Sequence, residues 1–166
     1  MKIIKKLSLY LASMIPYLAS ALLLFYTFTA SQSNLQNQID MIQKSLSMTV
    51  TQINFFTIII VLLSNILVLV FTFFIIKLII IIFDRNKVSK DEDLFFSLIL
   101  GYTAASLAAL LLNDLLNLPF ATITYYTPFI DLITFTILYY FFSKSKKFTI
   151  IIFFTKVIII LTGFFL

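Results

Sequence analysis

Asp131 and Lys156 are the residues of this chain whose charges and spacing are best suited to chemistry inside a membrane. Both lie within long apolar stretches, where an ionisable side chain is costly and usually serves a function. A short basic turn joins the two stretches, so their helices must be neighbours. Counting about 1.5 Å per residue from that turn puts Asp131 about 5 Å further out than Lys156. An ion pair between the two side chains is therefore geometrically possible.

Two roles are open for these charges. In a structural role, Asp131 and Lys156 neutralise each other, or Lys156 reaches a backbone carbonyl instead. In a functional role they line a path for protons or ions, although no second acidic residue lies near the midplane to relay charge. A third polar residue, Asn65, lies in the middle of another apolar stretch and is expected to form hydrogen bonds across helices. Lys77 lies close enough to the end of that stretch for its long side chain to reach the membrane interface.

Composition indicates that lipid is the natural solvent of this protein. The 166 residues are 61% hydrophobic and only 11% charged, whereas about 25% of residues are charged in an average soluble domain. There is no histidine and no cysteine, which removes the usual general base, thiolate nucleophiles and thiol ligands for metals. No phosphate-binding loop or hydrolase motif is present. We therefore expect a non-enzymatic protein without a cofactor.

The hydrophobic pattern predicts an all-α, polytopic membrane helix bundle in one domain, 1–166, with about five transmembrane helices. The expected elements are span 1 at 7–30, an outer amphipathic helix at 31–54, span 2 at 55–83, a cytoplasmic hinge at 84–93, span 3 at 94–116, span 4 at 125–142 and span 5 at 148–166. Because the fourth apolar stretch is short, four spans with one re-entrant segment remain the alternative.

The basic residues predict the orientation of these spans. Nine of them lie before span 1, in the hinge and in the turn before span 5, whereas Lys44 alone lies on the opposite side. Clustered lysine and arginine mark the cytoplasmic side. We therefore expect a cytoplasmic amino terminus, an outer carboxyl terminus and a place in a bacterial plasma membrane. The same clustering beside apolar stretches argues against nucleic acid as a partner, despite the net charge of +5.

Two surfaces are candidates for binding a protein partner. The first is an apolar stripe on the outer amphipathic helix, which either lies on the membrane or its own bundle, or docks a partner's helix; its residues are Leu35, Ile39, Ile42, Leu46 and Ile53. In an alternative interpretation, the outer helix continues directly into span 2. The second surface is a face of small residues on span 3, which permits close helix approach; its residues are Gly101, Ala105 and Ala108.

The hinge, "DRNKVSKDED", balances three basic against four acidic residues. Its last acids, Asp91 to Asp93, lie where span 3 begins, and acidic residues favour a helix amino terminus. Ser89 is a candidate cap for that helix. The hinge is thus either a well-built turn or a docking site for a cytoplasmic partner.

From about Phe55 onward the layout resembles the Yip family (the Ypt-interacting-protein type), including its small bacterial members. The resemblance lies in "IIKLIIIIFDRNKVSKDEDLFFSLILGYTAASLAALLL", with a long span, a charged hinge, the aromatic entry Phe95–Phe96, and then Gly101, Tyr102 and small residues. It implies a five-span protein with a cytoplasmic amino terminus and an outer carboxyl terminus. Eukaryotic members carry a long cytoplasmic segment that serves trafficking GTPases, whereas here only six residues precede span 1.

Three functions follow as hypotheses. The resemblance implies an accessory subunit that binds a larger membrane partner, for example an ABC-type peptide or toxin exporter. The intramembrane charges instead suggest a small transporter or ion-conducting subunit that uses Lys156 and Asp131. A subunit of a respiratory membrane complex has a similar size and number of spans.

Overall fold

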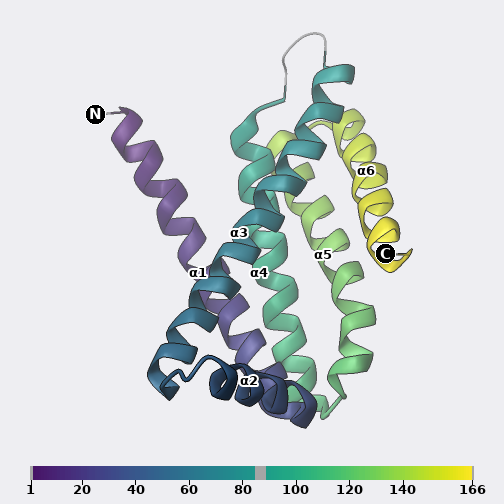
Figure 1. Cartoon of the computed structure of the whole chain (residues 1–166). Helices are drawn as coiled ribbons and strands as arrows, with labels where there is room; N and C mark the ends of the chain where they lie inside the picture. The colour runs from purple at the N-terminus through teal and green to yellow at the C-terminus, as the bar shows by residue number, and fades with distance from the viewer. Residues whose placement is uncertain (1, 85–88, 166) are drawn as a thin grey trace.

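The computed structural model is a bundle of six helices (Figure 1). It describes residues 2–84 and 89–165, without the side chains of residues 2–7, 33–34 and 164–165. The helices are α1 (Lys2–Ser31), α2 (Ser33–Ser45), α3 (Val50–Phe83), α4 (Asp91–Leu116), α5 (Phe120–Ser143) and α6 (Lys146–Phe165). Among the described residues, α1, α3, α4 and α5 are long and apolar enough to cross a membrane. The all-α prediction is confirmed, and these four helices indicate a membrane protein.

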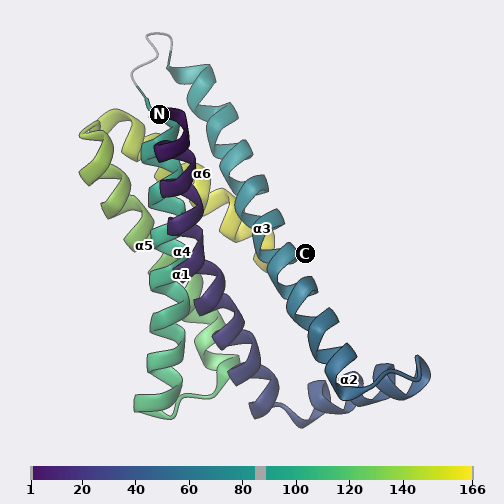
Figure 2. The same ribbon diagram turned by 90° about the vertical axis from the view of Figure 1, so that its left-hand side faces the viewer.

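The fifth predicted span corresponds to α6, which differs from the other four long helices. It has three lysines in 20 residues. Over the residues that the structure describes, it is not one of the helices that are long and apolar enough to cross a membrane. Figures 1 and 2 both show its carboxyl end near mid-height of the bundle. Along its described length, α6 therefore accompanies only one half of α4 and α5.

The two ends of the bundle differ in construction. In Figure 1, α2 lies across one end, where the α4–α5 turn also lies, and the α5–α6 turn lies towards the opposite end. We call these the α2 end and the hinge end, because the connection from α3 to α4 lies at the latter. Two residues of that connection that entered the charge asymmetry, Arg85 and Lys87, lie outside the described residues.

The predicted outer helix at 31–54 is divided between two helices, and it does not continue directly into span 2. α2 ends at Ser45, and Ser47 adopts a left-handed conformation with φ of 52°. Thr49 then starts α3 with a capping box: its hydroxyl accepts the Gln52 backbone N–H, and the Gln52 side chain accepts the Thr49 backbone N–H. Such a box satisfies two backbone donors at a helix start. It also places Ile53 on α3, where that side chain is buried.

The start of α5 also differs from the prediction. Asn117 closes α4 in a left-handed conformation, and the side chain of Asn113 donates a hydrogen bond of 3.0 Å to the Leu118 carbonyl. α5 begins directly after Pro119, five residues before the expected start of span 4. Pro128 therefore lies inside the helix.

The hinge region confirms one expectation and corrects another. Acidic residues occupy the first turn of α4 as predicted, and Asp91 forms an ion pair of 2.6 Å with Lys77 of α3. Ser89 does not cap α4, which starts after Lys90 without a side-chain cap. Instead the Ser89 hydroxyl lies 3.0 Å from the hydroxyl of Tyr139. Asp91 thus contacts α3, and Ser89 contacts α5.

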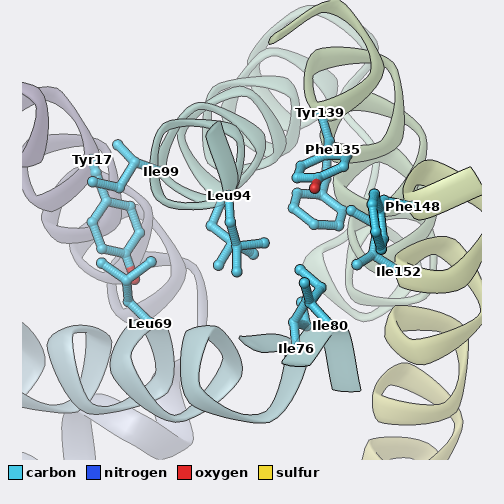
Figure 3. Close-up of a cluster of buried hydrophobic side chains, with 11 residues drawn as sticks. Tyr17, Leu69, Ile76, Ile80, Leu94, Ile99, Phe135, Tyr139, Phe148 and Ile152 are labelled. Carbon is cyan, nitrogen blue, oxygen red and sulfur yellow. The ribbon is translucent and has the colours of Figure 1, made fainter. Parts of the chain in front are cut away.

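A cluster of buried apolar side chains from all five long helices fills the bundle, mainly towards the hinge end (Figure 3). It consists of Tyr17, Leu69, Ile76, Ile80, Leu94, Leu98, Ile99, Phe135, Tyr139, Phe148 and Ile152. A smaller cluster towards the α2 end contains Ala109, Phe120 and Ile123 of α4 and α5, packed against α1. α3 is absent from the residues of this smaller cluster, and Figure 2 shows α3 leaning away from α4 and α5 towards the α2 end.

Candidate functional site

Asp131 and Lys156 form an ion pair deep inside the bundle. The Lys156 Nζ lies 2.9 Å from Oδ1 and 2.8 Å from Oδ2 of Asp131. Lys156 is 2% exposed and Asp131 is 6% exposed. The tight turn between α5 and α6 makes these helices neighbours, and the long lysine stem spans the offset in depth between the two residues. The pair that the spacing made possible is thus present.

Aromatic rings surround the ammonium of Lys156 on its other sides. Its Nζ lies 4.1 Å from the ring centroid of Phe135 and 4.7 Å from that of Tyr102. Aromatic faces attract cations within about 6 Å of the ring centroid. The ammonium therefore has one carboxylate and two ring faces as its neighbours.

Gly101 provides the room for this arrangement. A Cβ at that position would lie 3.1 Å from Asp131 Oδ1 and 3.2 Å from the Cβ of Phe135. Because the Phe135 Cβ is fixed to the backbone, α5 itself would have to shift to accept a side chain there. A glycine on α4 thus permits the close helix contact that seats the carboxylate.

Two tyrosines extend the polar contacts to the remaining long helices. The Tyr102 hydroxyl lies 3.0 Å from Thr72 Oγ1 of α3, and the Tyr17 hydroxyl donates to the backbone carbonyl of Asn65 at 2.9 Å. The rings of Tyr17 and Tyr102 stack with centroids 5.8 Å apart. We call this set the polar network: Tyr17, Asn65, Thr72, Tyr102, Asp131 and Lys156. Each of the five long helices contributes to it.

A cavity of about 790 Å³ borders the polar network. Its walls come from the five long helices and are mostly apolar, with Leu24, Phe28, Val61, Ile123 and Ile160 among the lining residues. The cavity extends from the polar network to residues of the α4–α5 region near the α2 end, such as Ala109 and Phe120. In this half of the bundle α3 leans away from α4 and α5, and α6 ends near mid-height (Figures 1 and 2).

The arrangement has the features of a small-molecule binding site. The cavity has the size of a small-molecule site, which is typically about 300–1,000 Å³, and its one pair of opposite charges lies at one end. Every buried side-chain N or O atom of the described residues has a hydrogen-bond partner. Among those same residues no three metal-binding side chains gather. A charged ligand group that reaches this end of the cavity meets a pair whose charges already neutralise each other.

The predicted partner surfaces need one correction. Gly101 and Ala105 are buried within the chain itself, and Gly101 packs on α5. These two residues of the small-residue face are therefore covered by the packing of α4 against α5 and are not available to a partner. Ala108 is half-buried. On α2, Leu35 and Ile39 are half-buried, whereas Ile42 and the adjoining Leu46 are exposed.

Sequence reasoning identified Asn65, Asp131 and Lys156 but missed three other members of the polar network. Tyr17, Thr72 and Tyr102 lie in the middle of apolar stretches. Tyrosine is enriched at the membrane interface. A tyrosine in the middle of an apolar stretch was therefore the sequence signal that could have indicated a buried polar contact. No protein-family model, curated protein or solved structure matches this chain.

Proposed function

We propose that this protein is a non-enzymatic membrane transport protein, or a transport subunit, that receives a small ligand in the cavity beside Asp131 and Lys156. One observation carries the proposal: a buried ion pair borders a cavity large enough for a small molecule. A purely structural ion pair does not require a cavity beside it. A transport site requires both a cavity for the ligand and polar groups that can exchange hydrogen-bond partners with it.

The proposal includes the orientation of the chain. The basic clusters support a cytoplasmic amino terminus, with α1, α3, α4 and α5 crossing the membrane. α6 then enters from the cytoplasmic side and ends near mid-height of the bundle. In that orientation the hinge end is cytoplasmic and the cavity belongs to the outer half of the membrane. The buried apolar cluster towards the hinge end then separates the cavity from the cytoplasmic side.

Cysteine labelling tests this arrangement, because the natural chain contains no cysteine. Ser106 of α4 lines the cavity, so Ser106→Cys should react with a charged, membrane-impermeant methanethiosulfonate added outside intact cells. Its neighbour Leu107 is 46% exposed on the surface of the bundle, so Leu107→Cys should be buried in lipid and react at least about tenfold more slowly. The measurement is the rate of modification, followed by a mass-tag shift on a gel.

Equal, slow labelling of Ser106→Cys and Leu107→Cys would contradict an outward-facing path. Labelling only from the cytoplasmic side of inverted vesicles would contradict the proposed orientation while leaving the cavity accessible.

The second candidate function is that of an accessory subunit of a larger membrane complex. The observation that favours it is the exposed apolar side of α2 and the adjoining turn, where Met41, Ile42 and Leu46 are each about half or more exposed. A helix of this kind either lies on the membrane surface or packs on a partner.

Purification in a mild detergent separates these roles of α2. If α2 docks a partner, the wild-type chain co-elutes with a defined second protein, and the double variant Ile42→Gln/Leu46→Gln loses it. Gln36→Ala, on an exposed polar position of the same helix, should retain the partner. A monodisperse, lone wild-type monomer would count against the accessory role.

A further inference from the structure

The neighbours of the Lys156 ammonium form a recognisable cation site. Two carboxylate oxygens contact it at 2.8–2.9 Å, and two ring centroids lie at 4.1 and 4.7 Å. This combination of a carboxylate with aromatic faces is how proteins bind an ammonium group. We call Asp131, Tyr102 and Phe135 the ammonium box. In the structure its occupant is a side chain of the same protein.

The cavity gives a ligand access to this box. Tyr102 and Asp131 both line the cavity, as does Lys156. Of the two charged partners, the Asp131 side chain is the more accessible, at 9% against 2% for Lys156. A carboxylate also has about four lone-pair sites, so it can accept a second donor while the first is still bound. An anion would have to approach an ammonium already enclosed by a carboxylate and two electron-rich ring faces.

Two other polar residues of the cavity, Thr124 and Thr127, present acceptors. Thr124 and Thr127 give their hydroxyl hydrogens to the carbonyls of Ala121 and Ile123 at 2.9 and 2.8 Å, which leaves their oxygen lone pairs. Pro128 has no N–H for the carbonyl of Thr124, four residues earlier in α5. These acceptors complement a ligand that donates hydrogen bonds.

We propose that the cavity binds an amphiphilic primary amine in its ammonium form, with the head group in the ammonium box in place of Lys156 and the hydrocarbon part against the apolar walls. This inference rests on the proposed transport function and names the class of its ligand. Lys156 is then a tethered competitor: the amine enters when the lysine leaves Asp131, and the returning lysine expels it.

Binding of octylammonium to the protein in lipid nanodiscs tests the inference, with octanoate and octanol as the anionic and neutral probes of equal chain length. Isothermal titration calorimetry, corrected with empty nanodiscs, gives the affinities. The wild type should bind octylammonium more tightly than it binds octanoate or octanol. Lys156→Met vacates the box and should bind octylammonium at least tenfold more tightly than the wild type does, and the bound amine should raise its melting temperature.

The double variant Asp131→Asn/Lys156→Met is the matched control, because it also lacks the lysine but has no buried charge. It should bind octylammonium no better than empty nanodiscs bind it. Should Lys156→Met fail to fold, the comparison of the wild type with this double variant decides the question.

Four results would overturn the inference: equal binding of octylammonium by Lys156→Met and the double variant, equal binding by Lys156→Met and the wild type, a preference for octanoate or octanol, or no octylammonium binding at all. A preference for octanoate or octanol would leave the cavity a ligand site and refute only the amine. If none of the three probes binds and Ser106→Cys is also unreactive, both the amine inference and the proposed transport function are refuted.

Discussion

Replacing Lys156 with methionine is expected to lower the free energy of unfolding by about 3–5 kcal/mol, the cost of breaking a buried ion pair from one side. Methionine keeps most of the length of the lysine stem but removes the ammonium that lies 2.8 Å from Asp131 Oδ2. The carboxylate would remain in a site that is 6% exposed, without its principal donor. Reversible unfolding in mixed dodecyl maltoside and dodecyl sulfate, followed by circular dichroism, measures the change.

Two controls separate the pair from the substitution itself. Adding Asp131→Asn to Lys156→Met removes the stranded charge, and should recover most of the loss, because a neutral replacement of a buried pair is often harmless. Lys44→Met on α2 changes an exposed lysine, and should alter stability by no more than about 0.5 kcal/mol. If Lys156→Met were as stable as Lys44→Met, the ion pair would not hold α5 and α6 together.

Replacing Gly101 with leucine is expected to cost about 3 kcal/mol, the upper part of the usual range for overpacking. Even the first atom of the new side chain would meet Asp131 Oδ1 at 3.1 Å and the Phe135 Cβ at 3.2 Å. Relief requires α4 and α5 to separate, which would also displace Asp131 from Lys156. The same unfolding measurement applies, with disulfide trapping between cysteines placed on α4 and α5 as a report of helix separation.

Gly163→Leu provides the matched control within the same chain. A Cβ at Gly163 would meet no atom within 4 Å, and leucine favours a helix over glycine by close to 1 kcal/mol. This variant should therefore be unchanged or slightly more stable. Comparable losses for Gly101→Leu and Gly163→Leu would show that glycine 101 is not needed for close packing.

The ion pair was predictable from the sequence because its geometry is nearly one-dimensional. Asp131 and Lys156 lie on consecutive helices joined by a tight turn, so residue counting alone fixes their relative depth. The depth of Asn65 followed in the same way. By contrast, the sequence contains no comparable constraint between Tyr17, Asn65 and Tyr102, which lie on α1, α3 and α4. Their contacts depend on helix rotation and tilt, which side-chain packing decides.

The partner of the small-residue face could not be read from the sequence for a similar reason. The spacing of Gly101 and Ala105 indicates that some helix approaches closely, but it does not indicate which helix. In the structure that helix is α5 of the same chain. The cavity could not be predicted from the sequence either, because it depends on the tilt of α3 and on the height at which α6 ends.

The break between α2 and α3 was present in the sequence but was interpreted differently. The residues from Leu35 to Ile53 were interpreted as one helical stripe, whereas Thr49 followed three residues later by Gln52 is the pattern of a capping box. The capping box stabilises a new helix start at Thr49, because it satisfies two backbone N–H groups that have no partner within the first turn of a helix. This local effect decided the helix boundary, although the apolar periodicity continues across it.

The position of Asp131 and Lys156 on consecutive helices has a consequence for biosynthesis. Lysine at the centre of a lone helix opposes insertion by the translocon by about 2.5–3.5 kcal/mol. The ribosome synthesises Asp131 before Lys156. Only the short turn after Ser143 separates α5 from α6. The carboxylate is thus already at the exit site when the ammonium emerges, and the last two helices can leave the translocon together as a neutralised hairpin.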